Sequence, residues 1–176
     1  MTWSDDTYRC SRCGETHRGL PMSYGASAPT LWYAIPPAER AARGELSADQ
    51  CIIDDYYFLL GNISIKVRDT DKSFLWIAWV SLAAADFVRA AEVWDMNGRE
   101  SEPPYPGRLA SELPGYPTTL NLKAEVYTRP VGERPFILLD DTDHPLAVEQ
   151  QDGITLARVQ EIAEAVRHGG STGETR

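Results

Sequence analysis

The chain has 176 residues, of which 43% are hydrophobic and 24% charged, and its formal net charge is −9. This length and composition are typical of a single globular domain with a sizeable buried core. The negative charge argues against nucleic-acid phosphate as the main partner, and it would suit a basic protein partner.

The sequence carries no signal for a membrane or for secretion. The longest nearly apolar run, residues 74–85, is shorter than the roughly 20 residues that a helix needs to span a bilayer. Residues 1–6 lack the basic and apolar regions of a secretory signal. Three cysteines, two of them at metal-like spacing, do not suggest a disulfide framework. We therefore expect a cytoplasmic protein with neither a membrane nor a nucleic acid as partner.

The first half of the chain predicts a loop-rich start followed by strands. Glycines and prolines interrupt residues 1–35, and residues 36–43 predict a short helix that ends at Gly44. Residues 51–53 and 56–60 predict two strands around a turn at Asp54 and Asp55. Residues 63–67 alternate as in a half-buried strand, whereas residues 74–80 are apolar on both faces and predict a central strand.

The second half predicts two helices and two further strands. Ser81 is a candidate N-cap for a helix carrying Phe87, Val88, Ala91 and Trp94 at helical spacing. Five prolines make residues 97–117 a long irregular connection, and loops of that length are often functional. Residues 120–126 and 134–139 predict strands. The last helix presents an apolar face beginning at Leu156, with Arg158, Glu161 and Glu164 pointing away from it.

These elements predict an α+β fold, a mostly antiparallel sheet flanked by two main helices, with a zinc-knuckle-like N-terminal segment. In this interpretation residues 1–35 form the knuckle-like segment, which packs on the main domain. Residues 36–168 form the α+β domain, and residues 169–176 form a disordered tail.

The motif most informative about chemistry is Cys10-x-x-Cys13-Gly14. A glycine after the second cysteine allows a tight turn that presents both thiolates to one ion, as in half of a tetrahedral zinc site. We predict Cys51, at the start of a strand, as the third ligand, and His17 as the fourth. His144 is the alternative fourth ligand.

Three sulfur ligands favour a closed, structural zinc site over a catalytic one, because a catalytic ion keeps an open position for water. The competing interpretation for Cys51 is a buried, small apolar side chain, a common environment for a free cysteine. Likewise, Trp76 and Trp79 are three residues apart on a predicted strand, so they should point to opposite faces and pack in the core.

A second candidate cluster is formed by Asp140, Asp141 and Asp143 with His144. Grouped carboxylates can bind a hard cation, or raise one another's pKa for acid–base chemistry. The spacing of an EF-hand is absent, so we favour a solvated turn.

A series of short motifs runs along nearly the whole chain. In order they are Cys10-x-x-Cys13-Gly14-x-x-His17, Gly19-Leu20-Pro21, Cys51-x-Ile53-Asp54, Trp76-x-x-Trp79-Val80-Ser81-Leu82, Pro104-Tyr105-x-Gly107, Leu120-x-Leu122-Lys123, Asp143-His144-Pro145-Leu146-Ala147 and Gly153-Ile154-Thr155. Together they closely resemble a bacterial family known as domain of unknown function 2199. The resemblance implies that the cysteines and His144 belong to a shared pattern, and it brings no activity with it. Asp55 departs from the glycine that similar proteins often have in this hairpin.

Two hypotheses for function follow from the sequence. The first is a small binding or interaction protein with structural zinc, of a size and charge that would suit an immunity or antitoxin role against a basic toxin. The second is a metal-dependent or cysteine–histidine enzyme centred on Cys51 and His144.

Overall fold

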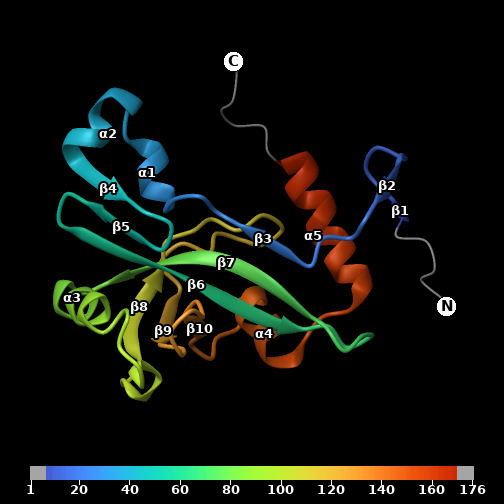
Figure 1. Cartoon of the computed structure of the whole chain (residues 1–176). Coiled ribbons are helices and arrows are strands. Elements are labelled where there is room, and N and C mark those ends of the chain that lie inside the picture. Colours follow the sequence, from blue (N-terminus) through green and yellow to red (C-terminus); the bar gives the residue numbers. More distant parts are fainter. Residues whose placement is uncertain (1–6, 170–176) are drawn as a thin grey trace.

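The computed structural model describes residues 7–169, which fold into strands and helices around a small barrel (Figure 1). In chain order the elements are β1 (Thr7–Arg9), β2 (Thr16–Arg18), β3 (Ser23–Gly25), α1 (Thr30–Ala34), α2 (Pro37–Arg43), β4 (Gly44–Leu46), β5 (Gln50–Ile53), β6 (Tyr56–Lys66), β7 (Ser73–Leu82), α3 (Ala84–Glu92), a 3₁₀ turn (Arg99–Ser101), β8 (Tyr105–Leu109), β9 (Lys123–Tyr127), β10 (Phe136–Leu139), α4 (Pro145–Asp152) and α5 (Leu156–Gly169). Within these residues the fold is therefore α+β, with five α-helices.

The two longest strands, β6 and β7, form the backbone of the barrel. They pair antiparallel over ten residue pairs, from Tyr57 opposite Leu82 to Lys66 opposite Ser73. Both strands are rich in β-branched and aromatic residues, which favour a pleated surface that is covered by other elements.

The sheet closes on itself, which corrects the predicted sheet flanked by two helices. β8 and β9 continue from β7 in antiparallel order, and β10 follows β9 and pairs in parallel with β6. At the closure the Asn62 N–H donates to the Pro135 carbonyl at 2.8 Å. Gly61 allows this approach, because a Cβ there would lie 2.8 Å from Cγ1 of Ile137. The result is a closed barrel of β6, β7, β8, β9 and β10.

Three other strands extend the sheet beyond the barrel. β5 pairs antiparallel with the first part of β6, and β4 pairs antiparallel with β5. β3 pairs in parallel with β7. β6 therefore has β5 beside its beginning and β10 beside its later part, which is why the sheet branches there.

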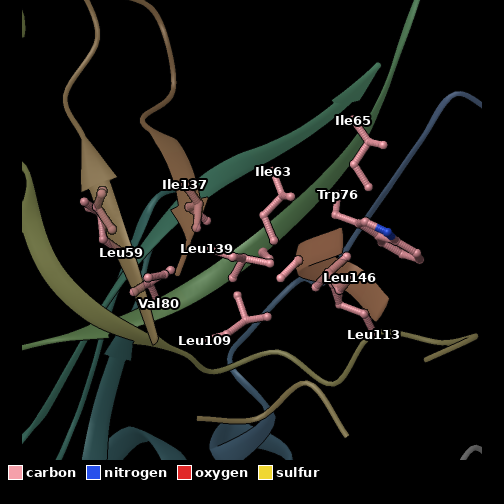
Figure 2. Packing of buried hydrophobic residues seen from close by; sticks show 14 of the residues in the cluster. Leu59, Ile63, Ile65, Trp76, Val80, Leu109, Leu113, Ile137, Leu139 and Leu146 are labelled. Carbon is pink, nitrogen blue, oxygen red and sulfur yellow. The ribbon is translucent and has the colours of Figure 1, made fainter. Parts of the chain in front are cut away.

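The main apolar core fills the barrel (Figure 2). Its buried side chains come from all five barrel strands, as expected for residues that point to a common interior. They include Leu59, Ile63 and Ile65 of β6, Trp76 and Val80 of β7, Leu109 of β8, Ala124 and Val126 of β9, and Ile137 and Leu139 of β10. Helices close the two ends, with α3 at one and α4 and α5 at the other (Figure 1).

A smaller core covers the outer face of the same two long strands. Trp79 packs there with Phe58 and Leu60, and its Nε1–H donates to the Ala26 carbonyl at 2.9 Å. Trp76 lies in the barrel interior instead. The prediction that the two tryptophans point to opposite faces and pack in the core is confirmed.

Several predicted elements differ in extent from the observed ones. The strands expected at 56–60 and 63–67 are one continuous strand, β6, and residues 97–117 contain β8. Ser81 is not an N-cap: it stays in β7 and its hydroxyl donates to the Arg108 carbonyl, while α3 begins at Ala84. The predicted tail starts at Gly169, which ends α5, and its residues 170–176 lie outside the described residues.

The close approach of β8 to β7 makes a prediction about Gly107. A Cβ at this position would lie 2.4 Å from Cγ1 of Val80 and 2.7 Å from the Ser81 carbonyl oxygen. We expect Gly107→Ala to lower the free energy of unfolding by about 1–3 kcal/mol, because the strands must separate to admit a methyl group. Urea denaturation measures this change.

The control for this variant is Gly169→Ala. Apart from Gly169 itself, its chain neighbours and the backbone of its own helix, no heavy atom lies within 4 Å of the position a Cβ would take there, so stability should be nearly unchanged. Equal stability of the Gly107→Ala variant and the wild type would contradict the close approach.

Candidate metal centre

The two cysteines of the knuckle lie in the turn of the β1–β2 hairpin. Here the Cys10 N–H donates to the Glu15 carbonyl at 2.8 Å, and the Gly14 N–H donates to the Cys10 carbonyl at 2.9 Å. Gly14 has a φ of 73°, a left-handed conformation that glycine adopts without strain. Across the ladder His17 of β2 pairs with Tyr8 of β1. The hairpin therefore brings the thiols and the His17 imidazole to one end.

A second histidine reaches this end from the last helix, which lies beside the hairpin (Figure 1). His168, near the end of α5, places its Nε2 3.2 Å from Sγ of Cys10. On the other side of the cluster, Nε2 of His17 lies 3.4 Å from Sγ of Cys13. One donor atom from each of the four residues lies within 4.8 Å of every other. The four side chains are therefore close enough to bind one metal ion.

Burial divides this cluster into an inner and an outer side. Cys10 is buried and packs in a small apolar cluster with Tyr8 and Ala163, whereas Cys13 and His168 are exposed and His17 is half-buried. An ion bound here would therefore lie at the surface, with Cys10 between it and the apolar cluster.

Helix α5 holds the hairpin through a polar stripe on one face. Gln160, Glu164 and His168 are four residues apart, so they lie along one side of the helix. The Gln160 side-chain amide donates to the Arg9 carbonyl at 2.9 Å. Glu164 accepts the Ser11 backbone N–H at 2.8 Å and also the Ser11 hydroxyl. Two of the three residues thus contact the backbone that surrounds Cys10, and the third contacts its sulfur.

The pKa values of the two thiols move in opposite directions. Burial acts to raise the pKa of Cys10, but hydrogen bonds from the backbone at Cys13 and Arg12 outweigh it, so this pKa is lowered. A backbone hydrogen bond at Glu15 acts to lower the pKa of Cys13, but loss of solvent and the neighbouring Cys10 together raise it. Cys10 is therefore the thiol that ionises first.

Glu164 is ionised at any ordinary pH. It is only 4% exposed. Hydrogen bonds from Gln160 and from both the side chain and the backbone of Ser11 nevertheless lower its pKa to about 2, outweighing its burial.

The structure does not bring Cys51 into the cluster. Cys51 is 1% exposed and packs with Ile53, Phe58 and Trp79 in the smaller core. This burial raises its pKa to about 11. Cys51 is therefore not placed as the third ligand, because the register of β5 directs its side chain into the apolar core. This is the alternative environment predicted from the sequence, that of a buried, small apolar side chain.

His144 is also placed away from the cysteines. It is the N-cap of α4, where its Nδ1 accepts the Leu146 N–H at 3.1 Å, and its Nε2 lies 3.2 Å from the Thr118 carbonyl oxygen. Both ring nitrogens therefore have local partners. His168 occupies the place that the sequence interpretation gave to Cys51 or His144.

The three aspartates near His144 form no comparable group. Within residues 7–169 the Cys10 cluster is the group of metal-ligating side chains whose donor atoms lie this close together. Asp140, Asp141 and Asp143 are exposed, and Asp141 accepts a hydrogen bond from the Gln151 side chain at 3.1 Å. This arrangement agrees with a solvated turn.

Sequence reasoning missed two residues of the site, both on α5. No pattern in the sequence marks His168 as a ligand, and the helical spacing of α5 predicts that Glu164 points away from the core. Glu164 is instead buried against the hairpin. The available signal was the helical spacing of Gln160, Glu164 and His168. Nothing in that spacing says that the hairpin, whose Ser11 lies 153 residues before Glu164, packs against it.

The fold and the site together define a small α+β barrel protein with a Cys₂His₂ cluster that could hold a metal. The chain belongs to DUF2199, an uncharacterized protein family conserved in bacteria, whose family model matches residues 9–154. Glu164 and His168 lie after the matched range. Comparison with curated proteins and with solved structures gives no match. No helix in residues 7–169 is long and apolar enough to cross a membrane.

The thiol environments predict an order of chemical reactivity. We expect iodoacetamide at pH 8, in the presence of a zinc chelator, to modify the exposed Cys13 and to spare Cys51. With a pKa of about 11, only about one Cys51 thiol in a thousand is ionised at that pH, and burial blocks access. Peptide mass spectrometry after brief treatment measures the modification, and denatured protein is the control. Rapid native labelling of Cys51 would contradict its placement in the core.

Proposed function

We propose that the protein binds one Zn²⁺ at Cys10, Cys13, His17 and His168, and that the ion is structural. The observation that carries this proposal is the convergence of four ligand atoms within 4.8 Å of one another. These donors come from the N-terminal hairpin and from the last helix.

The donor set fits zinc by chemistry and by size. Two thiolates and two imidazoles are a common structural zinc set. Zn–S bonds of about 2.3 Å in a tetrahedron put two sulfurs about 3.8 Å apart. The observed spread of donor atoms, up to 4.8 Å, needs only small side-chain rotations to reach this arrangement.

The structural role follows from the number of protein ligands. With four protein ligands no coordination position is left for a reacting water. An ion at this point would instead link the hairpin to α5, adding to the hydrogen bonds from Gln160 and Glu164. We therefore assign the ion to holding the two chain segments together.

For the biological role we propose binding of a protein partner with a basic surface, as an immunity- or antitoxin-like protein would do. The net charge of −9 supports this assignment. Tyr33 of α1 and Tyr56 at the start of β6, which are 57% and 60% exposed, offer apolar contact area to such a partner.

The enzyme alternative, centred on Cys51 and His144, gains no support from their surroundings. Cys51 has its pKa raised by burial, which opposes a nucleophilic thiolate. His144 uses Nδ1 to cap α4, so it is not held as a base for Cys51.

The zinc proposal predicts metal content for the wild type and its variants. We expect about one zinc per chain, and a sharp loss of zinc in Cys13→Ser and His168→Ala, because each removes a ligand. Native mass spectrometry and elemental analysis measure the ratio. Cys51→Ala and His144→Ala are the matched controls, and both should retain zinc. Zinc loss in the Cys51→Ala variant with an intact fold would return Cys51 to the ligand set.

Zinc should also raise thermal stability. At free zinc 100 times above the dissociation constant, binding to the folded state adds about 2.7 kcal/mol. We expect a chelator to lower the Tm of the wild type and to leave that of His168→Ala unchanged. A wild-type Tm that does not respond to zinc or chelator would contradict a structural ion.

The partner proposal is tested by photo-crosslinking in cells from position 33 or 56, with position 72 as control. Lys72 lies in the turn between β6 and β7, at the other end of the barrel. Crosslinks to a basic protein from 33 or 56 alone are expected. Equal crosslinking from all three positions would contradict this surface.

A further inference from the structure

A buried carboxylate of α5 lies directly behind the metal cluster. Both oxygens of Glu164 are engaged by Ser11, the residue that follows Cys10 inside the Cys-x-x-Cys turn. Gln160 donates to the same carboxylate at 2.9 Å and also to the Arg9 carbonyl. Helix α5 thus contacts the chain on both sides of Cys10.

Hydrogen bonds from uncharged groups hold this carboxylate in place, and the charge of Arg12 makes only a smaller contribution to lowering its pKa. Within the described part of the chain no Lys, Arg or His nitrogen lies within 4 Å of Glu164. A buried carboxylate without an ion pair is costly unless its oxygens accept several hydrogen bonds. Glu164 accepts such bonds from Ser11 and Gln160. The side-chain hydrogen bonds that Glu164 makes in the described residues therefore all go to Ser11, in the Cys10–Cys13 turn, and to Gln160, which binds the neighbouring Arg9 carbonyl.

We propose that Glu164 is a positioning residue, which fixes the Cys10–Cys13 turn on α5 in the metal-free protein and thereby sets the affinity for zinc. This inference rests on the proposed zinc site. Glu164 is not itself a ligand, since its two oxygens are bonded to Ser11. It acts through the turn that carries the ligands.

The physical basis is preorganisation. A free Cys-x-x-Cys turn loses backbone freedom when it binds a metal, at a cost of about 1–2 kcal/mol for each residue that becomes fixed. The bonds from Ser11 to Glu164 fix the turn beforehand, so less of this cost falls on the binding step. Groups that orient metal ligands in this way are typically worth about 10–100-fold in metal affinity.

The helix register extends the argument to the fourth ligand. His168 lies one helical turn beyond Glu164. By holding the Cys10–Cys13 turn against α5, the Glu164 carboxylate therefore also fixes the distance between that turn and the His168 ring. The contact between Nε2 of His168 and Sγ of Cys10, 3.2 Å apart, is the outcome of that register.

The test compares zinc affinities by competition with a chromogenic chelator. We expect Glu164→Ala to bind zinc about 10–100-fold more weakly than the wild type. Glu164→Gln, which keeps the shape and an acceptor oxygen, should recover part of the loss. The matched control is Glu161→Ala, on the same helix. Glu161 has a side chain that is 66% exposed, and it pairs with Arg158 rather than with the hairpin. The zinc affinity of the Glu161→Ala variant should therefore equal that of the wild type.

A second variant keeps the proposal testable if Glu164→Ala does not fold. Ser11→Ala removes only the hydroxyl donor and leaves the backbone N–H in place, so we expect a smaller loss of affinity. In the double variant that carries Ser11→Ala and Glu164→Gln, the two losses of zinc-binding free energy should not add, because both changes act on the same contact. Full additivity would overturn the proposal.

Two measurements separate positioning from general stability. The Co²⁺ absorption spectrum reports the ligand set, which should stay the same in every variant that still binds. The helix content of the metal-free protein should change little, while its zinc affinity falls. Equal zinc affinity in Glu164→Ala and the wild type would overturn the role of Glu164 alone. A wild-type chain that binds no zinc would instead remove the zinc site itself.

Discussion

The antiparallel pairing of β6 with β7 is the contact on which the rest of the structure depends. One face of this ten-pair ladder supplies the barrel interior, through side chains such as Ile63 and Trp76, and the other supports the smaller core around Trp79. The remaining barrel strands, β8, β9 and β10, surround the other sides of the same core. The helices α4 and α5 in turn close one end of that core, with Leu146 and Ile162 buried in it.

The metal cluster depends on the same core indirectly, through helix α5. Helix α5 is fixed by burial of Val159 and Ile162 against the barrel, and this burial sets which side of the helix faces outward to the hairpin. The stripe that includes Glu164 and His168 lies on that side. A hairpin of two three-residue strands has little apolar surface of its own, so its position follows from α5, and the geometry of the cluster follows from both.

Local patterns in the sequence were sufficient to predict most of the strands and the turn that carries the two cysteines. Alternation over residues 63–67 predicted part of β6, and the run 74–80, apolar on both faces, predicted β7. The Cys-x-x-Cys-Gly motif predicted the turn that carries Cys10 and Cys13. What the sequence could not supply was pairing between distant segments. Only the fold shows that Gly61 lies against Ile137 and that β10 is the neighbour that closes the barrel. His168 was not identifiable as a ligand for the same reason, since its partner Cys10 is 158 residues away.

That separation of 158 residues between Cys10 and His168 has a mechanical consequence. If zinc joins them, the ion closes nearly the whole chain into a ring, and the barrel lies within it. A force that pulls residues 7 and 169 apart would then pass from the hairpin through the ion to the end of α5. The barrel strands would carry no load until a metal–ligand bond broke. Resistance to pulling from the ends would be set by the coordination bonds, whereas resistance to heat would depend on the apolar core together with the ion.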